Sequence, residues 1–296
     1  MKRNMAEKMA SEGQPVKVAL ETVGLSRSSY YYRPIKQRKP RPLDESLVDA
    51  IREVRQGYAE VYGYRKVTEA LRAAGWVVNG KKVLRHLRAL GLTQPRKMRG
   101  RRWSRPSIVR PQSRNTYWEA DLTYVWAGGA NAYLCAVIDA CDKDIVGDVF
   151  SDRCRAREAA KALEDAVVRR FGGRVPEDYE LTLRVDRGTQ FAARSFRETA
   201  RVLNVKLEYA GIQCPDDKPY IESFFDKYKL EEVYRHEYLS LAEARAGWKS
   251  YRAWYRNDRL HQNLGYRSPV NFGKSFPGRI TSEGESNISV AQNSPV

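Results

Sequence analysis

WEADLTYVWAGGANAYLCAVIDACDKDIVGDVFS, residues 118–151, consists of three short apolar runs separated by residues that favour turns. Gly128 and Gly129 follow the first run, and Asp142 and Lys143 follow the second. Short apolar runs with turn-forming residues between them predict β-strands joined by tight connections. The stretch therefore predicts a three-stranded antiparallel meander.

Helical and extended patterns alternate after this meander. The expected elements are, in order, a helix over 156–172, a strand over 181–186, a helix over 193–204, a strand over 206–210, and helices over 219–234 and 241–258. Three strands followed by alternating helix and strand indicate layered α/β structure. We therefore expect an α/β fold with a mixed five-stranded sheet and flanking helices.

The part of the chain before residue 95 has a helical pattern. VKVALETVGLSRSSYYYR, residues 16–33, predicts two helices with a turn at Gly24 and an N-cap at Ser26. This is the outline of a helix-turn-helix, and it also fits an ordinary helical hairpin. Helical patterns then begin at Asp44 and cover 62–75 and 79–91, with a glycine at the end of the last two.

Positive charge gathers on one face of the helix at 79–91 and in the segment after it. The helix has Lys81, Lys82, Arg85 and Arg88 largely opposite its apolar side chains, which suits a DNA groove and also fits a solvated charged face. Residues 96–114 contain eight Lys or Arg, two prolines and no acid. We expect an extended basic linker that binds DNA phosphates. Its expected contacts are Arg96, Lys97, Arg99, Arg101, Arg102 and Arg105.

The overall composition supports a nucleic-acid partner. The 296 residues include 53 Lys and Arg against 36 Asp and Glu, a formal net charge of +17. Such a charge favours a polyanionic partner. The four cysteines form no C-x-x-C pair, so free thiols are expected and a zinc finger is not. No apolar run approaches the roughly 20 residues of a membrane span. We expect a cytoplasmic protein.

Two candidate catalytic acids belong to predicted strands. Asp121 lies inside an apolar run, where an unpartnered carboxylate is costly. Asp186 follows the run at 181–185, at the carboxyl end of a strand, which is where α/β sheets place binding groups. Taken alone, Asp186 also fits the first residue of a turn.

The third acid comes from PDDKPYIESFFDKYKLEEVY, residues 215–234. At about 100° per residue, Glu222 borders the apolar face of Ile221 and Phe224 in the first helical turn. Lys229 lies two turns further along the same border, where it fits a phosphate contact or a solvated lysine. Helical phase separates Glu222 from the acids Asp226, Glu231 and Glu232, while Asp216 and Asp217 favour the helix N-terminus.

Three carboxylates from two strands and one helix predict a divalent-metal site. A pair of cations about 3.5–4 Å apart stabilises the attacking and leaving oxygens of an in-line phosphoryl displacement. Ligands that are all oxygen favour Mg²⁺, with Mn²⁺ as a substitute. The sequence thus predicts two Mg²⁺ ions held by Asp121, Asp186 and Glu222.

The spacing of these motifs resembles a known family. Thirty-five residues separate Asp186 from Glu222, and Lys229 follows seven after the glutamate. Together with WEADLTYV, LRVDRGTQF, IESFFDKYKLEEVY and YRNDRLHQNLGYRSPVNF, this pattern resembles the second-frame (OrfB) transposases of the IS-three family of bacterial insertion sequences, relatives of retroviral integrases. The resemblance covers residues 15 to about 274.

The resemblance implies an RNase-H-like core with a catalytic triad of Asp121, Asp186 and Glu222. Members of the family cut a transposon end with water and then join the freed 3′ hydroxyl to another phosphodiester. The partner is double-stranded DNA, bound by a homo-multimer that is fused to or assisted by an upstream-frame protein, with a location at the bacterial nucleoid. The motif containing Arg259 and His261 is expected to be mainly structural, with both residues as candidate DNA contacts.

The sequence departs from the family pattern at two places. Arg184 and Val185 replace the usual His-Ser before the second aspartate, and Asp216, Asp217, Lys218 and Pro219 stand where Asp-Asn-Ala is usual. Two other functions stay open. One is a nuclease of the same fold that only hydrolyses DNA, and the other is a DNA-binding regulator of transposition with an idle core.

The expected domains follow these patterns. They are an N-terminal helix-turn-helix segment at 1–40, a helical DNA-binding domain at 41–94, the basic linker at 95–114, the RNase-H-like catalytic core with its C-terminal helix at 115–274, and a disordered tail at 275–296.

Overall fold

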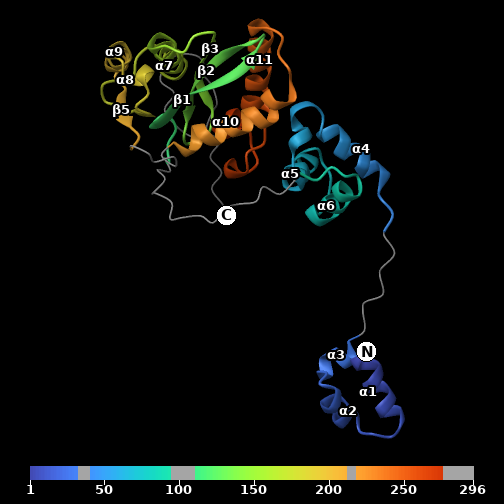
Figure 1. The fold of residues 1–296 in the computed structure, drawn as a ribbon. Coiled ribbons are helices and arrows are strands. Elements are labelled where there is room, and N and C mark those ends of the chain that lie inside the picture. Colours follow the sequence, from blue (N-terminus) through green and yellow to red (C-terminus); the bar gives the residue numbers. More distant parts are fainter. Residues whose placement is uncertain (33–40, 95–110, 212–217, 276–296) are drawn as a thin grey trace, which may run out of the picture. The chain divides into compact units, whose positions relative to one another are not determined.

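The computed structural model of the chain describes residues 1–32, 41–94, 111–211 and 218–275. The chain divides into two compact units, Met1–Asp44 and Glu45–Val296. Figure 1 shows the elements of both units, and each unit is described by itself. The basic residues predicted to contact DNA between Arg96 and Arg105, and the acids Asp216 and Asp217, lie outside the described residues.

The described part of the first unit contains three helices. These are α1 (Lys2–Ser11), α2 (Val16–Val23) and α3 (Arg27–Tyr31). Gly24 ends α2 in the left-handed conformation (φ 59°), and the Ser26 hydroxyl caps α3 by accepting a hydrogen bond from the Ser29 amide at 3.2 Å. The predicted turn and N-cap are therefore confirmed. The helix α1 was not predicted, and its Ala6 packs with Ala19 and Leu20 of α2.

The second unit begins with a small helical bundle. Its elements are α4 (Glu45–Val54), a 3₁₀ turn η1 (Gly57–Val61), α5 (Tyr64–Ala73) and α6 (Gly80–Ala89). One apolar stripe of each α-helix is buried in a common core that includes Leu47, Leu71 and Leu87. Glycines with positive φ follow α5 and α6, as predicted.

In the described residues that follow this bundle, the unit contains a mixed five-stranded sheet with helices on both faces. Its strands are β1 (Tyr117–Ala127), β2 (Ala130–Asp139), β3 (Ile145–Ser151), β4 (Thr182–Val185) and β5 (Lys206–Tyr209). The order is β3-β2-β1-β4-β5, with antiparallel pairing among β1 to β3 and parallel pairing of β1 with β4 and of β4 with β5. The predicted meander and mixed sheet are confirmed.

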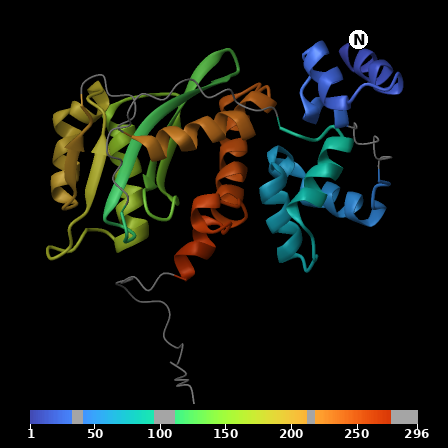
Figure 2. The same ribbon diagram turned by 90° about the horizontal axis from the view of Figure 1, so that it is seen from below.

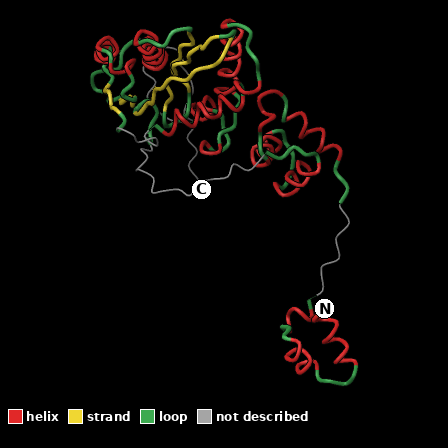
Figure 3. The backbone as a smooth tube through the Cα atoms, in the orientation of Figure 1, coloured by secondary structure: helices red, strands yellow, loops and turns green. Residues whose placement is uncertain are grey.

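Helices cover both faces of the sheet, as the ribbon in Figure 2 and the tube in Figure 3 show. The helices are α7 (Ala156–Phe171), α8 (Thr189–Ala192), α9 (Arg194–Val202), α10 (Pro219–Glu231), α11 (Leu241–Asn257) and α12 (Pro269–Lys274), with 3₁₀ turns η2 (Val233–Arg235) and η3 (Gln262–Leu264). One core joins the sheet to α7 and α9, and a second joins it to α10 and α11. Among the described residues, no helix is both long and apolar enough to cross a membrane.

Two details of the core bear on the sequence predictions. Gly147 of β3 allows α7 to approach, because a Cβ at this position would collide with the Ala162 carbonyl oxygen and with Ala166. The cysteines of the described residues, Cys135, Cys141 and Cys154, are free thiols, as expected.

Candidate active site

Asp121 lies in β1, and Asp186 directly follows the neighbouring parallel strand β4. The last aligned pair of β1 and β4 is Glu119 with Arg184, and each aspartate lies two residues further along its strand direction. Side chains alternate along a strand, so these four residues belong to one face of the sheet, the α10 side. The pairing of β1 with β4 ends at this pair, whereas the pairing of β4 with β5 continues to Val185.

A lysine lies between the two aspartates. The Lys218 Nζ atom is 2.9 Å from Asp121 Oδ2 and 3.5 Å from Asp186 Oδ2. Lys218 is 6% exposed, so its ammonium group is held away from bulk water. The other oxygen of each aspartate accepts a backbone hydrogen bond, at 2.9 Å from the Leu122 amide and at 2.8 Å from the Gly188 amide.

The charges around Asp121 oppose one another. Burial raises the pKa of Asp121, because a carboxylate loses its hydration in the protein interior. The Lys218 ammonium and the hydrogen bond from the Leu122 amide lower the same pKa, and the negative charge of Asp186 raises it again. The two carboxylates are thus close enough to repel, and one cation holds them together.

The start of α10 is attached to β1 through a buried glutamate. One oxygen of Glu119, Oε2, accepts hydrogen bonds of 2.9 Å from the amides of both Tyr220 and Ile221. These are first-turn amides, which have no partner within a helix, and Pro219 is the first helical residue. Glu119 therefore caps α10 from a position two residues before Asp121. This fixes the backbone of the first turn of α10 relative to that aspartate.

Glu222 belongs to this capped turn. Its amide donates to the Lys218 carbonyl oxygen at 3.1 Å, and its side chain is exposed. Burial is the main cause that raises the pKa of Glu119 to about 7, against the lowering by the Ile221 and Tyr220 amides and by the Lys143 charge, and the charge of Glu222 contributes to the rise. Glu222 is thus near enough to β1 for its charge to act on Glu119.

The described residues do not bring three acids into one ready metal site. Within them, no group of three or more His, Cys, Asp or Glu side chains is close enough to hold an ion. Asp121 and Asp186 nevertheless fit a cation, because the Lys218 ammonium already lies between one oxygen of each. Carboxylate oxygens also suit Mg²⁺ or Mn²⁺ chemically. The convergence of Glu222 with the two aspartates stays a prediction.

Lys229 lies beside β1. Its Nζ atom is 5.1 Å from the ring centre of Tyr124, which is 61% exposed. Tyr124 follows Asp121 along β1 by three residues, which is about 10 Å along the strand and on its other face. The phosphate contact of Lys229 stays a prediction.

Arg259 and His261 are buried, which does not favour the DNA contacts predicted for them. Arg259 is 3% exposed and His261 is 8% exposed, so neither side chain presents a surface for a duplex in this structure. Arg259 forms two hydrogen bonds to Glu231, from Nε to Oε2 at 2.7 Å and from Nη2 to Oε1 at 2.5 Å. Burial opposes ionisation of Glu231, but the bonds and charge of Arg259 outweigh it and keep the pKa of Glu231 below its usual value. Both residues are structural.

The charged face of α6 has the predicted form. Lys81, Lys82 and Arg88 are exposed and Arg85 is half-buried, while the opposite face is buried against the bundle. Asn79 caps the helix by accepting a hydrogen bond of 2.8 Å from the Lys81 amide. The helix thus presents a row of cations outside its own bundle core.

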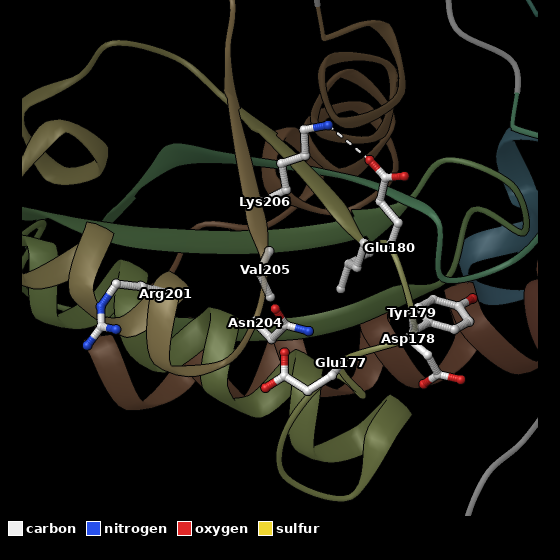
Figure 4. A pocket seen from close by; sticks show the side chains of 9 residues that line it. Glu177, Asp178, Tyr179, Glu180, Arg201, Asn204, Val205 and Lys206 are labelled. Atoms are coloured by element: carbon white, nitrogen blue, oxygen red, sulfur yellow. Dashed lines mark hydrogen bonds and ion pairs between the residues drawn. The ribbon is translucent and has the colours of Figure 1, made fainter.

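A hollow of about 440 Å³ lies elsewhere on the sheet. It is lined by residues 177–181, before β4, and by residues of α9 and the start of β5, as Figure 4 shows. At its edge Lys206 forms an ion pair of 2.9 Å with Glu180. Because the hollow is at the amino end of β4 and Asp186 follows the carboxyl end, it is not part of the candidate active site.

Glu119 and Lys218 were not predicted as site residues. Glu119 had a detectable signal, because it is an acid in the same apolar run as Asp121 and two residues away from it, hence on the same face of a strand. Lys218 stood out as a departure from the family pattern. Its contact with two strands far away in sequence could not be inferred from local spacing.

The chain matches models of known protein families. Two models, each described as an integrase core domain, match residues 111–215 and 203–269, and a model of an HTH-like domain matches residues 42–102. The matched regions contain the sheet, the candidate site and the small helical bundle.

Similar proteins come from bacterial insertion sequences. An uncharacterized 31.7 kDa protein of insertion element IS407 from Burkholderia multivorans is 29% identical over 257 residues, which cover 86% of this chain and 88% of that protein. The transposase for insertion sequence element IS904 of Lactococcus lactis is 28% identical over 255 residues, which cover 82% of this chain and 98% of that protein.

The transposase InsF for insertion sequence IS3A of Escherichia coli (strain K12) is 29% identical over 227 residues, which cover 71% of this chain and 76% of that protein. The chain therefore belongs to the integrase-core proteins, whose two models together span residues 111–269, it is similar to insertion-sequence transposases, and its core contains the mixed five-stranded sheet that was predicted.

Proposed function

We propose that this transposase is a metal-dependent polynucleotidyl transferase that cuts a transposon end and joins the freed 3′ hydroxyl to a second DNA. The observation that carries the proposal is the placement of Asp121 and Asp186 at equal height on β1 and β4, around a single cation. The capped first turn of α10 supplies Glu222 as the third acid.

The three acids have the same proposed task, which is to hold two Mg²⁺ ions, with Mn²⁺ as substitute. When bound, such ions polarise the phosphodiester and stabilise the attacking and leaving oxygens. Asp121 and Asp186 offer one oxygen each, the Oδ2 atoms that now face the Lys218 ammonium, because backbone amides engage the other oxygen. Glu119 acts on the site by fixing the helix turn that carries Glu222.

The basic residues outside this site are the proposed DNA-binding surfaces. The exposed cations of α6, Lys229 beside β1, and the predicted linker from Arg96 to Arg105 would contact phosphates, which gives affinity without sequence information. Neutralising several linker arginines should weaken binding to any duplex. It should also make the plot of log K against log salt less steep, by about 0.9 in slope for each lost contact. A change in sequence preference at constant slope would identify the linker as a base reader.

Transposition also requires two DNA ends in one assembly, so we propose a homo-multimer on DNA, with fusion to or help from an upstream-frame protein. The family resemblance supports both proposals. Light scattering of the chain with and without duplex transposon ends tests the first. A monomer in both conditions would contradict it.

A strand-transfer experiment tests the enzymatic proposal. The chain is incubated with Mg²⁺, an unlabelled target plasmid, and a duplex that contains one end of the insertion sequence with its flanking DNA. The label is at the 5′ end of the insertion-sequence strand whose 3′ hydroxyl is freed by cutting, so it stays with the strand that is joined. We expect labelled plasmid from the wild type and none from Asp186→Asn. Asp178→Asn is the matched control, because Asp178 is an exposed aspartate before the opposite end of β4.

The products separate the three functions. Joined product supports a transferase. Cleavage without joining would indicate a nuclease that only hydrolyses. Binding without either reaction would indicate a regulator with an idle core.

A further inference from the structure

The proposed chemistry gives no role to Lys218. This residue directly precedes α10, and its side chain is buried with the ammonium group directed at Asp121 and Asp186. The Nζ distances of 2.9 and 3.5 Å are those of a cation bridging two carboxylates. A buried charge needs such partners, so the lysine and the two aspartates stabilise one another.

A metal ion that bridges the same oxygens cannot share this space with the ammonium group. Mg²⁺ binds carboxylate oxygens at about 2.0–2.1 Å, so it would lie between Asp121 Oδ2 and Asp186 Oδ2, where Nζ now lies. The two groups are also both positive and would repel each other at contact distance. Metal binding by these two oxygens therefore requires Nζ to move away.

The backbone around Lys218 allows this movement without unfolding the helix. The Lys218 carbonyl oxygen accepts the first hydrogen bond of α10 from the Glu222 amide at 3.1 Å, and Glu119 holds the next amides. These three hydrogen bonds anchor the backbone of residues 218–222. The four-carbon side chain has rotatable bonds, so the ammonium group can leave while the backbone stays in place.

We propose that Lys218 is a positioning residue that acts as a built-in cation. In the metal-free chain it takes the place of a bridging metal and keeps Asp121 and Asp186 from repelling each other. It leaves when a divalent ion binds, so it sets the metal concentration at which the site fills. This inference rests on the proposed function, because it requires the two aspartates to be metal ligands.

Metal affinity measures this competition directly. Mn²⁺ binding to the full chain, without DNA, is followed by the electron paramagnetic resonance signal of the free ion. Lys218→Met and Lys218→Gln are expected to bind Mn²⁺ at least about tenfold more tightly than the wild type, since a competing charge at contact distance is gone. Two variants are used because one neutral side chain is apolar and the other is polar.

The control variant is Lys206→Met. Lys206 forms an ion pair of 2.9 Å with Glu180, at the amino end of β4, so it matches Lys218 in chemistry and not in place. Its Mn²⁺ affinity should equal that of the wild type. Thermal unfolding gives a second readout. In EDTA the Lys218 variants should melt below the wild type, because the two aspartates repel, and Mn²⁺ should raise their melting temperature by more.

The outcomes separate this inference from the proposed function. Unchanged or weaker Mn²⁺ binding in both folded Lys218 variants would overturn the role of Lys218. Asp121→Asn is included to locate the bound ion. If Asp121→Asn binds Mn²⁺ as the wild type does, the aspartates are not ligands, and the proposed function fails together with the inference.

Discussion

Removing the Arg259 side chain should destabilise the fold and leave the DNA-contacting surface intact. Arg259 and Glu231 have side chains that are 3% and 5% exposed, and they share two hydrogen bonds. In Arg259→Met the Glu231 carboxylate stays buried. Its remaining described hydrogen-bond partner is the Tyr251 hydroxyl, which donates at 2.9 Å. Breaking a buried pair in this way costs about 3–5 kcal/mol.

This cost is large enough to measure by unfolding. For a domain of this size, about 1 kcal/mol changes the melting temperature by roughly 2–4 °C, so Arg259→Met should melt on the order of 10 °C lower. The double variant Glu231→Met with Arg259→Met removes both charges and should recover most of the loss. Urea unfolding followed by circular dichroism completes the double-mutant cycle.

An exposed arginine provides the control. Arg201 pairs with Glu198 on the surface of α9, so Arg201→Met should leave the unfolding midpoint unchanged. Fluorescence anisotropy with a labelled duplex is measured on the folded fraction of each variant. If Arg259→Met unfolds like the wild type and binds duplex more weakly, Arg259 contacts DNA and our reading of its burial is wrong.

Three further predictions concern pH, the helix cap and DNA binding. Burial and neighbouring positive charges lower the pKa of His261 far below its ordinary 6.5, so its contribution to stability is present above about pH 6.5 and is lost as the pH falls. Through this group the unfolding free energy should drop by about 1.4 kcal/mol between pH 7.5 and 5.5. His261→Asn should remove this part of the pH dependence of stability. The same pH dependence in the variant and the wild type would contradict a neutral buried ring. Glu119→Ala leaves two first-turn amides of α10 without their cap and should cost about 1–3 kcal/mol and lower strand transfer, whereas Glu119→Gln keeps an acceptor oxygen and should retain most of both. Equal melting temperatures of the two variants would show that the cap is unimportant. Replacing Lys81, Lys82 and Arg88 of α6 with alanine should weaken duplex binding and lower its salt slope by up to about 2.7, or about 0.9 for each contact, and an unchanged affinity would exclude this face as a DNA surface.

Much of the core fold could be predicted because its signals are local. The meander at 117–151 alternates apolar runs with turn residues, and Gly75 and Gly91 follow helices in the left-handed conformation that glycine adopts easily. The apolar stripe of α10 was also correct, since Ile221 and Phe224 are buried and Glu222 is not. Each of these features depends on residues within one or two helical turns or strands.

The candidate site depends on contacts between distant residues, so the sequence predicted less of it. Asp121 and Asp186 were chosen separately, and only the parallel pairing of β1 with β4 places them side by side. The partner of both, Lys218, approaches from a third segment. Helical phase separated Glu231 from Glu222, but the buried ion pair of Glu231 depends on Arg259, which is 28 residues away. Charge can be read from sequence, whereas the partner that neutralises it cannot.

The family resemblance suggested some residues that the structure places at the candidate site and others that it buries elsewhere. It agreed with the choice of the two aspartates and Glu222, and the structure places the aspartates together. It also suggested Arg259 and His261 as DNA contacts, and both are buried. A motif residue is retained for packing as readily as for binding, and only the exposed surface area of the folded chain distinguishes the two roles.

The central claim is that Asp121 is a metal ligand in DNA strand transfer, and a change of ligand chemistry tests it most directly. A thiolate favours softer ions than Mg²⁺, so ligand type should decide which metal supports the reaction. We expect Asp121→Cys to be inactive in strand transfer with Mg²⁺ and to regain activity with Mn²⁺ or Cd²⁺, while Asp178→Cys works with Mg²⁺ like the wild type. Full strand transfer by Asp121→Cys in Mg²⁺ alone would contradict the claim.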